Sequence, residues 1–194
     1  YTIGGAFWEF GSPDWEKTEL FMIFGVAEDH DSNPIKIGLG KLKERGVRTI
    51  SVNPVQTGYS AVADDWVGIT PGTDGLFILS LIHVLMEAGK IDIDYLIRYT
   101  NAPWLVIRNP GAANDGLFLR DEDDTPLMLD RSTGKTVKSD KKGITPALNG
   151  EVKLEDGSIA VPAFTLMADE WMSPELTPEA TEAQTGVPAA RVRK

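Results

Sequence analysis

Cysteine is absent from the 194 residues of this sequence, and histidine occurs only twice, as His30 and His83. The lack of cysteine excludes disulfides, thiolate zinc sites, cysteine-held iron–sulfur clusters and a cysteine nucleophile within these residues. Two histidines leave little scope for imidazole chemistry. His83 stands in a strongly apolar segment, where we expect a core histidine with one ring nitrogen hydrogen-bonded.

Long apolar runs and clustered basic residues are also missing. No apolar run approaches the roughly 20 residues that a helix needs to cross a bilayer, and no secretory signal pattern is visible. We therefore expect a cytoplasmic protein. The formal net charge is −10, which argues against a nucleic-acid partner, because phosphate backbones are bound by clustered Lys and Arg.

Several catalytic and nucleotide-binding fingerprints are absent: GxGxxG, GxxxxGK[ST] and GxSxG. The missing glycine-rich turn argues against a Rossmann-type NAD enzyme. We predict no catalytic residue and no metal ligand in the chain, since nothing pairs Asp64 or Asp65 with a base or a metal. The acidic loop 28–31 has ligand-type side chains, but its spacing fits no known metal loop, and a solvated or phosphate-adjacent loop is the other interpretation.

The first half of the chain alternates strand-like and helix-like segments. An apolar run that ends at Gly25 predicts a buried strand, a helix follows from Pro34 to Gly46, and the β-branched stretch 47–52 predicts a second strand. This βαβ unit predicts an α/β fold, a three-layer Rossmann-like domain with a mainly parallel sheet. The further expected elements are a helical turn at 60–65, a third strand at 66–69, a buried helix at 74–88 and an amphipathic helix at 92–99.

Beyond Asn101 the composition changes. The stretch 109–157 is rich in Gly, Asp, Pro, Lys and Thr, and we expect an irregular, hairpin-rich excursion without a core of its own. Its candidate strands are 117–119, 127–129 and 152–154, and a helix is expected at 162–171. The predicted organisation is a Rossmann-like binding region at 1–108, an insertion-like hairpin region at 109–161 and a C-terminal helical segment at 162–194.

Polar or glycine-containing turns follow each of the three predicted strands. Ser32 and Asn33 precede a helix, where they could cap it or help to hold a phosphate. Asn53 and Pro54 follow the second strand, at the position where dinucleotide-binding folds meet ribose hydroxyls.

The third turn, Pro71 to Asp74, opens the apolar helix. Gly72 permits close backbone approach, and Asp74 can cap the helix or accept hydrogen bonds from the edge of a purine. Since parallel strands end at one edge of a sheet, we expect the three turns to form a single nucleotide pocket.

Three stretches of the chain resemble the molybdopterin oxidoreductases of the dimethyl sulfoxide reductase superfamily. They are FGVAEDHDSNP (24–34), KLKERGVRTISVNPVQTGYSAVADDWVGITPGTDG (41–75) and LIHVLMEAGKIDIDYLIRYTN (81–101). The series NPxxT, AD.W and PGTD is specific to that family, and the tail at 162–192 is similar to the family's lead into its TGV helix.

The resemblance implies a role in binding molybdopterin guanine dinucleotide with molybdenum. It implies that the loop 25–33, with Gly25, Ser32 and Asn33, contacts the pyrophosphate. Asn53, with Pro54 and Thr57 of the same series, would meet the guanosine ribose. Asp74 would read the guanine edge, with Gly72 making room.

The resemblance also implies that this is an internal segment of the catalytic subunit of a longer oxidoreductase, inactive alone. Its expected partners are an iron–sulfur electron-transfer subunit, together with the rest of the catalytic subunit. The first loop is most similar to subunits that oxidise sulfite or other sulfur oxyanions. The alternative interpretation is a non-catalytic α/β module whose acidic surface docks a partner protein.

Overall fold

The computed structural model describes residues 14–25, 35–56 and 58–194 and has a mixed α/β architecture. Its contacts divide the chain into two compact units. Unit 1 comprises 1–78 with 181–192 and 194, and unit 2 comprises 79–180 with 193. These units do not follow the three ranges expected from the sequence, because the C-terminal segment returns to the unit that the N-terminal segment builds.

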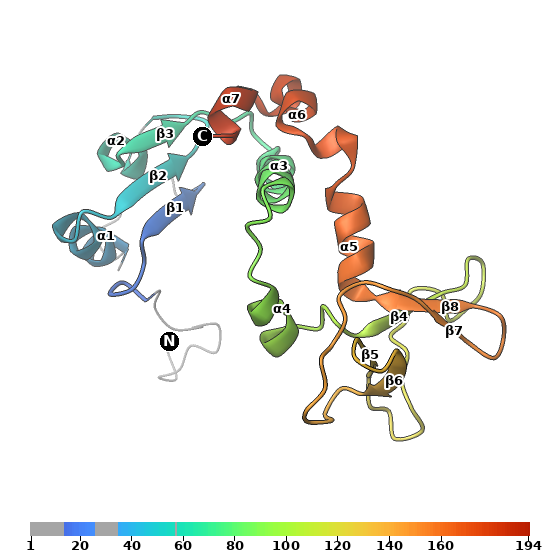
Figure 1. Ribbon diagram of the computed structural model, residues 1–194. Helices are drawn as coiled ribbons and strands as arrows, with labels where there is room; N and C mark the ends of the chain where they lie inside the picture. Colours follow the sequence, from blue (N-terminus) through green and yellow to red (C-terminus); the bar gives the residue numbers. More distant parts are fainter. Residues whose placement is uncertain (1–13, 26–34, 57) are drawn as a thin grey trace, which may run out of the picture. The chain divides into compact units, whose positions relative to one another are not determined.

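Unit 1 is built on a three-stranded parallel sheet in the order β1-β2-β3 (Figure 1). Its strands are β1 (Leu20–Phe24), β2 (Arg48–Val52) and β3 (Asp65–Val67), and its helices are α1 (Ile35–Glu44), α2 (Tyr59–Val62), the start of α3 (Asp74–Glu87), the end of α6 (Pro178–Thr185) and α7 (Ala189–Val192). The predicted α/β class with a parallel sheet is confirmed.

The βαβ unit forms as its sequence predicts. Gly46, with φ +71°, ends α1 in a conformation that glycine adopts without steric cost, and Lys41 and Lys43 lie in the last turn, where the helix dipole favours cations. The core of unit 1 is a cluster of buried apolar side chains, with Trp15 and Phe21 packed against it. Its members are Ile23, Leu39, Leu42, Val47 and Tyr59.

Unit 2 contains two antiparallel sheets and the remaining helices. The sheets have the orders β4-β8-β7 and β5-β6. Their strands are β4 (Leu105–Arg108), β5 (Leu127–Asp130), β6 (Lys135–Lys138), β7 (Val152–Lys153) and β8 (Ile159–Pro162), and the helices are the rest of α3, α4 (Ile93–Tyr99), α5 (Ala163–Trp171), the 3-10 turn η1 (Pro174–Leu176) and the start of α6.

Two expectations for this part of the chain were wrong. The excursion does have a core: Leu105, Leu129, Ala147 and Ala160 form a buried cluster, because β4 and β8 pair across the whole excursion and close it into a packed unit. The segment 117–119 forms only an isolated bridge at Phe118 instead of a strand.

The helix α3 is less buried than its apolar composition predicts. Phe77 and His83 are buried, whereas Ile78 is 40% exposed and Leu85 is 49% exposed. The helix is apolar on nearly every side, and most of its other apolar residues are half-buried. None of the described helices has both the length and the apolarity needed to cross a membrane.

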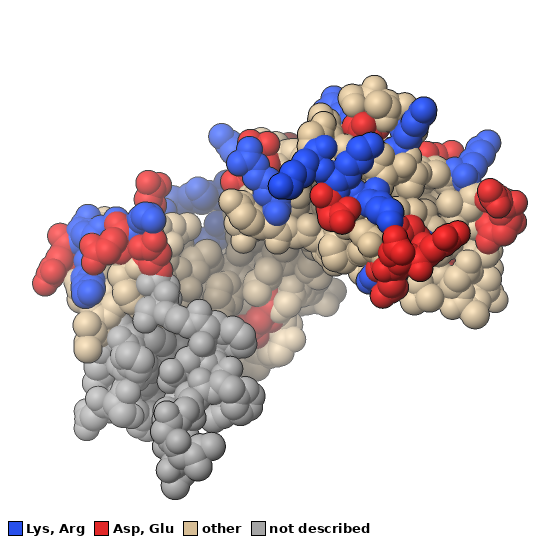
Figure 2. Space-filling model, turned by 90° about the horizontal axis from the view of Figure 1, so that it is seen from below, with Lys and Arg blue, Asp and Glu red and all other residues tan. Residues whose placement is uncertain are grey.

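Charges of both signs lie close together on one face of the protein. On the face shown in Figure 2, basic side chains lie among acidic ones. Ion pairs of this kind include Lys138 with Asp121 and Asp123, and Arg193 with Glu87 and Glu179. These pairs place positive and negative charge side by side within unit 2.

Candidate functional site

The carboxyl ends of β1 and β2 lie side by side at one edge of the unit 1 sheet (Figure 1). The Gly25 N–H donates to the Val52 carbonyl at 3.1 Å, and the Asn53 N–H donates to the Val67 carbonyl at 3.1 Å. The ends of all three strands are therefore tied together by backbone hydrogen bonds. Gly25 and Asn53, two of the predicted binding positions, leave the sheet at this common edge.

Asn53 is held in one orientation by local hydrogen bonds. It is buried, and its Oδ1 accepts from the Val55 N–H at 3.1 Å, a side-chain turn typical of asparagine. Its carbonyl accepts from the Trp66 indole N–H at 2.8 Å. Pro54 follows and is exposed, so the chain turns away from the sheet directly after Asn53.

The third predicted turn leads into α3 close to the same edge. Gly72 has φ +83°, a conformation in which a side chain would be strained, and no heavy atom lies within 4 Å of where its Cβ would be. Asp74 is the first residue of α3. The ring of Phe77, in the same helical turn, lies 6.3 Å from that of Phe24 at the end of β1. The start of α3 therefore packs near the point where β1 ends.

Ser32, Asn33 and Thr57, three of the predicted binding positions, lie outside the described residues, as does the acidic loop 28–31. Among the residues that the structure does describe, no group of three or more His, Asp or Glu side chains could hold a metal ion.

Asp64 and Asp65, considered as acid–base candidates, have structural partners. The Asp64 carboxylate accepts from the Thr49 N–H at 2.7 Å and from its hydroxyl at 2.8 Å. These hydrogen bonds lower the pKa of Asp64 from its usual value. Asp65 pairs with Arg48 at 3.4 Å and with Arg191. Both carboxylates join neighbouring parts of unit 1.

His83 is a core histidine, as predicted. It is 4% exposed, and its Nδ1 lies 2.9 Å from the Trp171 carbonyl. Since a carbonyl only accepts, Nδ1 carries the proton in this contact. His83 belongs to unit 2, whereas the strands β1 to β3 belong to unit 1.

Two side chains next to the edge were not singled out from the sequence. Trp66 donates to the Asn53 carbonyl, and a Cβ at Gly68 would come within 3.0 Å of its ring. The alternation Trp66-Val67-Gly68 is the signal that could have revealed this close packing. Tyr59 is 4% exposed, and no described residue is a hydrogen-bond partner of its hydroxyl. No sequence pattern distinguishes such a tyrosine from an ordinary core residue.

Comparison with known proteins shows the family of this chain. No protein-family model matches the chain. The chain is 44% identical over its whole length to a sulfite dehydrogenase subunit of Allochromatium vinosum, and it covers 21% of that protein. It is 27% identical to the nitrate reductase alpha chain of Bacillus subtilis, over 82% of this chain and 12% of that protein.

The chain is a homologue of molybdopterin oxidoreductase catalytic subunits of the dimethyl sulfoxide reductase superfamily. A solved structure agrees on the fold: acetylene hydratase from Pelobacter acetylenicus superposes with a TM-score of 0.54 and 14% identity, over 92% of this chain and 16% of that one. The resemblance inferred from the sequence is thus confirmed. This molybdopterin oxidoreductase homologue spans about a fifth or less of the relatives' length.

Proposed function

We propose that this chain binds one molybdopterin guanine dinucleotide of a molybdenum oxidoreductase. The single observation that carries the proposal is the meeting of Gly25, Asn53 and the start of α3 at the carboxyl edge of a parallel sheet, where α/β proteins bind nucleotides. The sulfite dehydrogenase and nitrate reductase relatives support the choice of this cofactor family.

The residues present fit such a group. The edge offers a left-handed glycine at Gly25 and another at Gly72, both with open space where a Cβ would be. The buried hydroxyl of Tyr59 has no hydrogen-bond partner in the described part of the chain. Since most buried polar groups are paired, this hydroxyl is suited to a polar ligand. When bound, the cofactor would supply the redox chemistry through its molybdenum.

Each residue of the edge has a distinct proposed part in holding the cofactor. Asp74 accepts hydrogen bonds from the N–H edge of guanine, and Gly72 leaves room for the base. Asn53 contacts the ribose of the guanosine, its orientation held by Val55 and Trp66. Gly25 lets the backbone approach the pyrophosphate. Ser32 and Asn33 are proposed as further pyrophosphate contacts, and Pro54 and Thr57 as further contacts of the ribose.

For the longer enzyme that contains such a segment, we propose oxidation of sulfite or another sulfur oxyanion. The support is the difference in identity, 44% over the whole chain for the sulfite dehydrogenase relative and 27% for the nitrate reductase relative. The proposed partners are an iron–sulfur electron-transfer subunit, together with the rest of the catalytic subunit. Alone, this chain would bind the cofactor without turning over substrate.

The role of Asp74 can be tested by Asp74→Ala in the enzyme that carries this segment. Loss of hydrogen bonds to a charged acceptor costs about 1.5–3 kcal/mol, so we expect a roughly 10- to 150-fold weaker cofactor affinity. The measurement is the molybdenum and guanine content of the purified enzyme, together with calorimetry of guanosine diphosphate and adenosine diphosphate binding to this chain.

Asp94→Ala is the matched control, because Asp94 also lies in the first turn of a helix and is exposed. It should leave the cofactor content and the preference for guanine unchanged. Equal molybdenum and guanine contents in the Asp74→Ala variant and the unaltered enzyme would contradict the proposal. Such a result would favour the interpretation of the chain as a protein-interaction module.

A further inference from the structure

Tyr59 combines a buried aromatic ring with a hydroxyl that the fold does not use. The residue begins α2 and is 4% exposed, and its ring belongs to the apolar cluster of unit 1. The hydroxyl oxygen is buried and has no hydrogen-bond partner among residues 14–25, 35–56 and 58–194. Most buried polar groups in proteins are paired, so the ring alone does not account for a tyrosine at this position, since phenylalanine would pack equally well.

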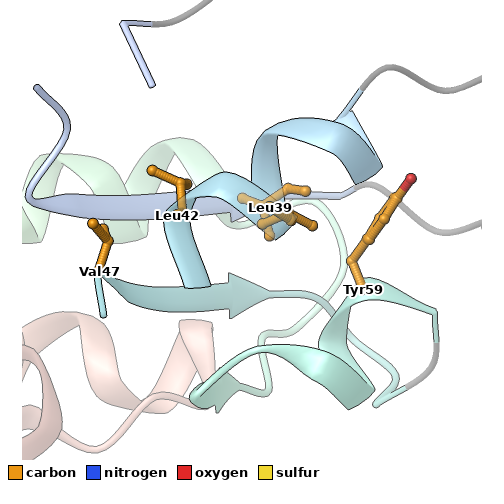
Figure 3. Close-up of a cluster of buried hydrophobic side chains, with 5 residues drawn as sticks. Leu39, Leu42, Val47 and Tyr59 are labelled. Atoms are coloured by element: carbon orange, nitrogen blue, oxygen red, sulfur yellow. The ribbon is translucent and has the colours of Figure 1, made fainter. Parts of the chain in front are cut away.

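The hydroxyl faces a definite part of unit 1. Figure 3 shows the Tyr59 ring beside Leu39, with its hydroxyl directed away from Leu42 and Val47. Leu39 lies nearer to the start of α1 than Leu42 does, and Val47 precedes β2. The hydroxyl therefore points toward the end of the cluster at which α1 begins and β2 ends, which is the edge that carries Asn53.

The start of α1 favours an anion on physical grounds. The helix has ten residues, its first N–H groups have no partner within the helix, and its dipole places partial positive charge at this end. Phosphate groups commonly bind at such helix ends in α/β folds. A phenol hydroxyl is a neutral donor at neutral pH, so it adds a directed hydrogen bond to an anionic oxygen.

We propose that the Tyr59 hydroxyl donates a hydrogen bond to a phosphate oxygen of the bound guanine dinucleotide. This inference rests on the proposed function and adds a binding residue to it. Among the described residues the hydroxyl has no hydrogen-bond partner, and its place at the carboxyl edge assigns it to the ligand. The ring contributes to the core, and the oxygen contributes to the site.

The test is Tyr59→Phe, which removes one oxygen and keeps the ring. Three probes are titrated by calorimetry into the unaltered chain and the variant: guanosine diphosphate, guanosine and inorganic pyrophosphate. We expect guanosine diphosphate and pyrophosphate to bind roughly tenfold more weakly or worse, as for a lost hydrogen bond to a charged group, while guanosine affinity stays unchanged. The melting temperature of the ligand-free chain should stay the same or rise, because an unpaired buried hydroxyl is removed.

Tyr99→Phe is the control variant, since Tyr99 is 72% exposed and should change neither affinity nor melting temperature. A lower melting temperature for Tyr59→Phe with equal phosphate affinity would show a structural hydroxyl and overturn the inference. Equal weakening of guanosine binding and of guanosine diphosphate binding would also overturn the assignment to phosphate.

If the unaltered chain binds guanosine diphosphate and Tyr59→Phe binds it equally well, this inference fails and the proposed function stands. If the unaltered chain binds none of the probes, both fail.

Discussion

Replacing Trp66 by phenylalanine should destabilise unit 1 by breaking the contact that holds Asn53. The indole N–H of Trp66 donates to the Asn53 carbonyl at 2.8 Å, and Asn53 is 4% exposed. Water therefore cannot readily replace the lost donor. Phenylalanine keeps an aromatic ring in β3 but has no N–H, so the substitution acts mainly on this one hydrogen bond.

The magnitude follows from the burial of the acceptor. Leaving a buried acceptor without its donor costs about 1–3 kcal/mol. The smaller ring also loses contacts where Trp66 packs against Gly68, which adds roughly 1 kcal/mol. We therefore expect a loss of about 2–4 kcal/mol in the free energy of unfolding. A Cβ at Gly68 would lie 3.0 Å from the Trp66 ring, which shows how closely the ring packs against this glycine.

The assay is urea unfolding followed by far-ultraviolet circular dichroism, since removing a tryptophan changes the fluorescence baseline. Trp15→Phe is the matched control in the same unit, because Trp15 is held by ring packing on Phe21 at 5.5 Å. A loss below about 0.5 kcal/mol for Trp66→Phe, or a loss no larger than that of the control, would refute the reasoning, since surface-type substitutions fall in that range.

Two further predictions concern stability. Leu42→Ala should lower the free energy of unfolding by about 2–5 kcal/mol, because Leu42 is fully buried in the unit 1 core. The control Leu20→Ala, at a half-exposed position of β1, should lower it by less than about 1 kcal/mol. Equal urea midpoints for the two variants would contradict the assigned core. Asp130 has its pKa lowered from 3.8 to about 2, first by the hydrogen bond from the Ser132 hydroxyl. Because the folded-state pKa is the lower one, this carboxylate stabilises the fold above the ordinary pKa, and the stabilisation is lost as the pH falls from 3.8 toward about 2. The measurement is the melting temperature between pH 5 and 2. It should depend less on pH in Asp130→Asn than in the unaltered chain, whereas the control Asp140→Asn, at an exposed position, should match the unaltered chain.

The first half of the fold could be read from the sequence because its signals are local. The apolar run before Gly25 and the glycine at Gly46 mark the ends of β1 and α1 within a few residues. The third strand was predicted at 66–69 and lies at Asp65–Val67 instead. Its position is set by the pairing of Ile50 in β2 with Asp65, and pairing registers are not visible in local composition.

The strands β4 and β8 were missed for a related reason. Leu105 pairs with Pro162 and Arg108 pairs with Ile159, so each strand finds its partner more than fifty residues away. Both strands are only four residues long, too short for a reliable periodic signal. The excursion between them is polar and rich in turns, which hid the core that the pairing creates.

The candidate site shows the same division between local and non-local information. Asn53, Gly72 and Asp74 could be proposed from the sequence because they lie in or directly after turns with a recognisable composition; their binding roles stay predictions. Trp66 and Tyr59 could not, since their importance depends on where an indole N–H and a phenol oxygen lie in space. The indole N–H meets a carbonyl thirteen residues earlier in the chain.

The hydrogen bonds of unit 1 separate scaffold from ligand contacts. Thr49 is paired with Asp64, and the Ser51 and Ser60 hydroxyls lie 2.7 Å apart, so the buried hydroxyls on β2 and on α2 after Tyr59 are used within the fold. The Tyr59 hydroxyl, next to Ser60 in sequence, has no such partner among the described residues. An unpaired buried hydroxyl costs free energy in the ligand-free fold, and a hydrogen bond to the proposed nucleotide would offset that cost. On this proposal the edge contains both the groups that hold the strands together and a group that contacts the ligand.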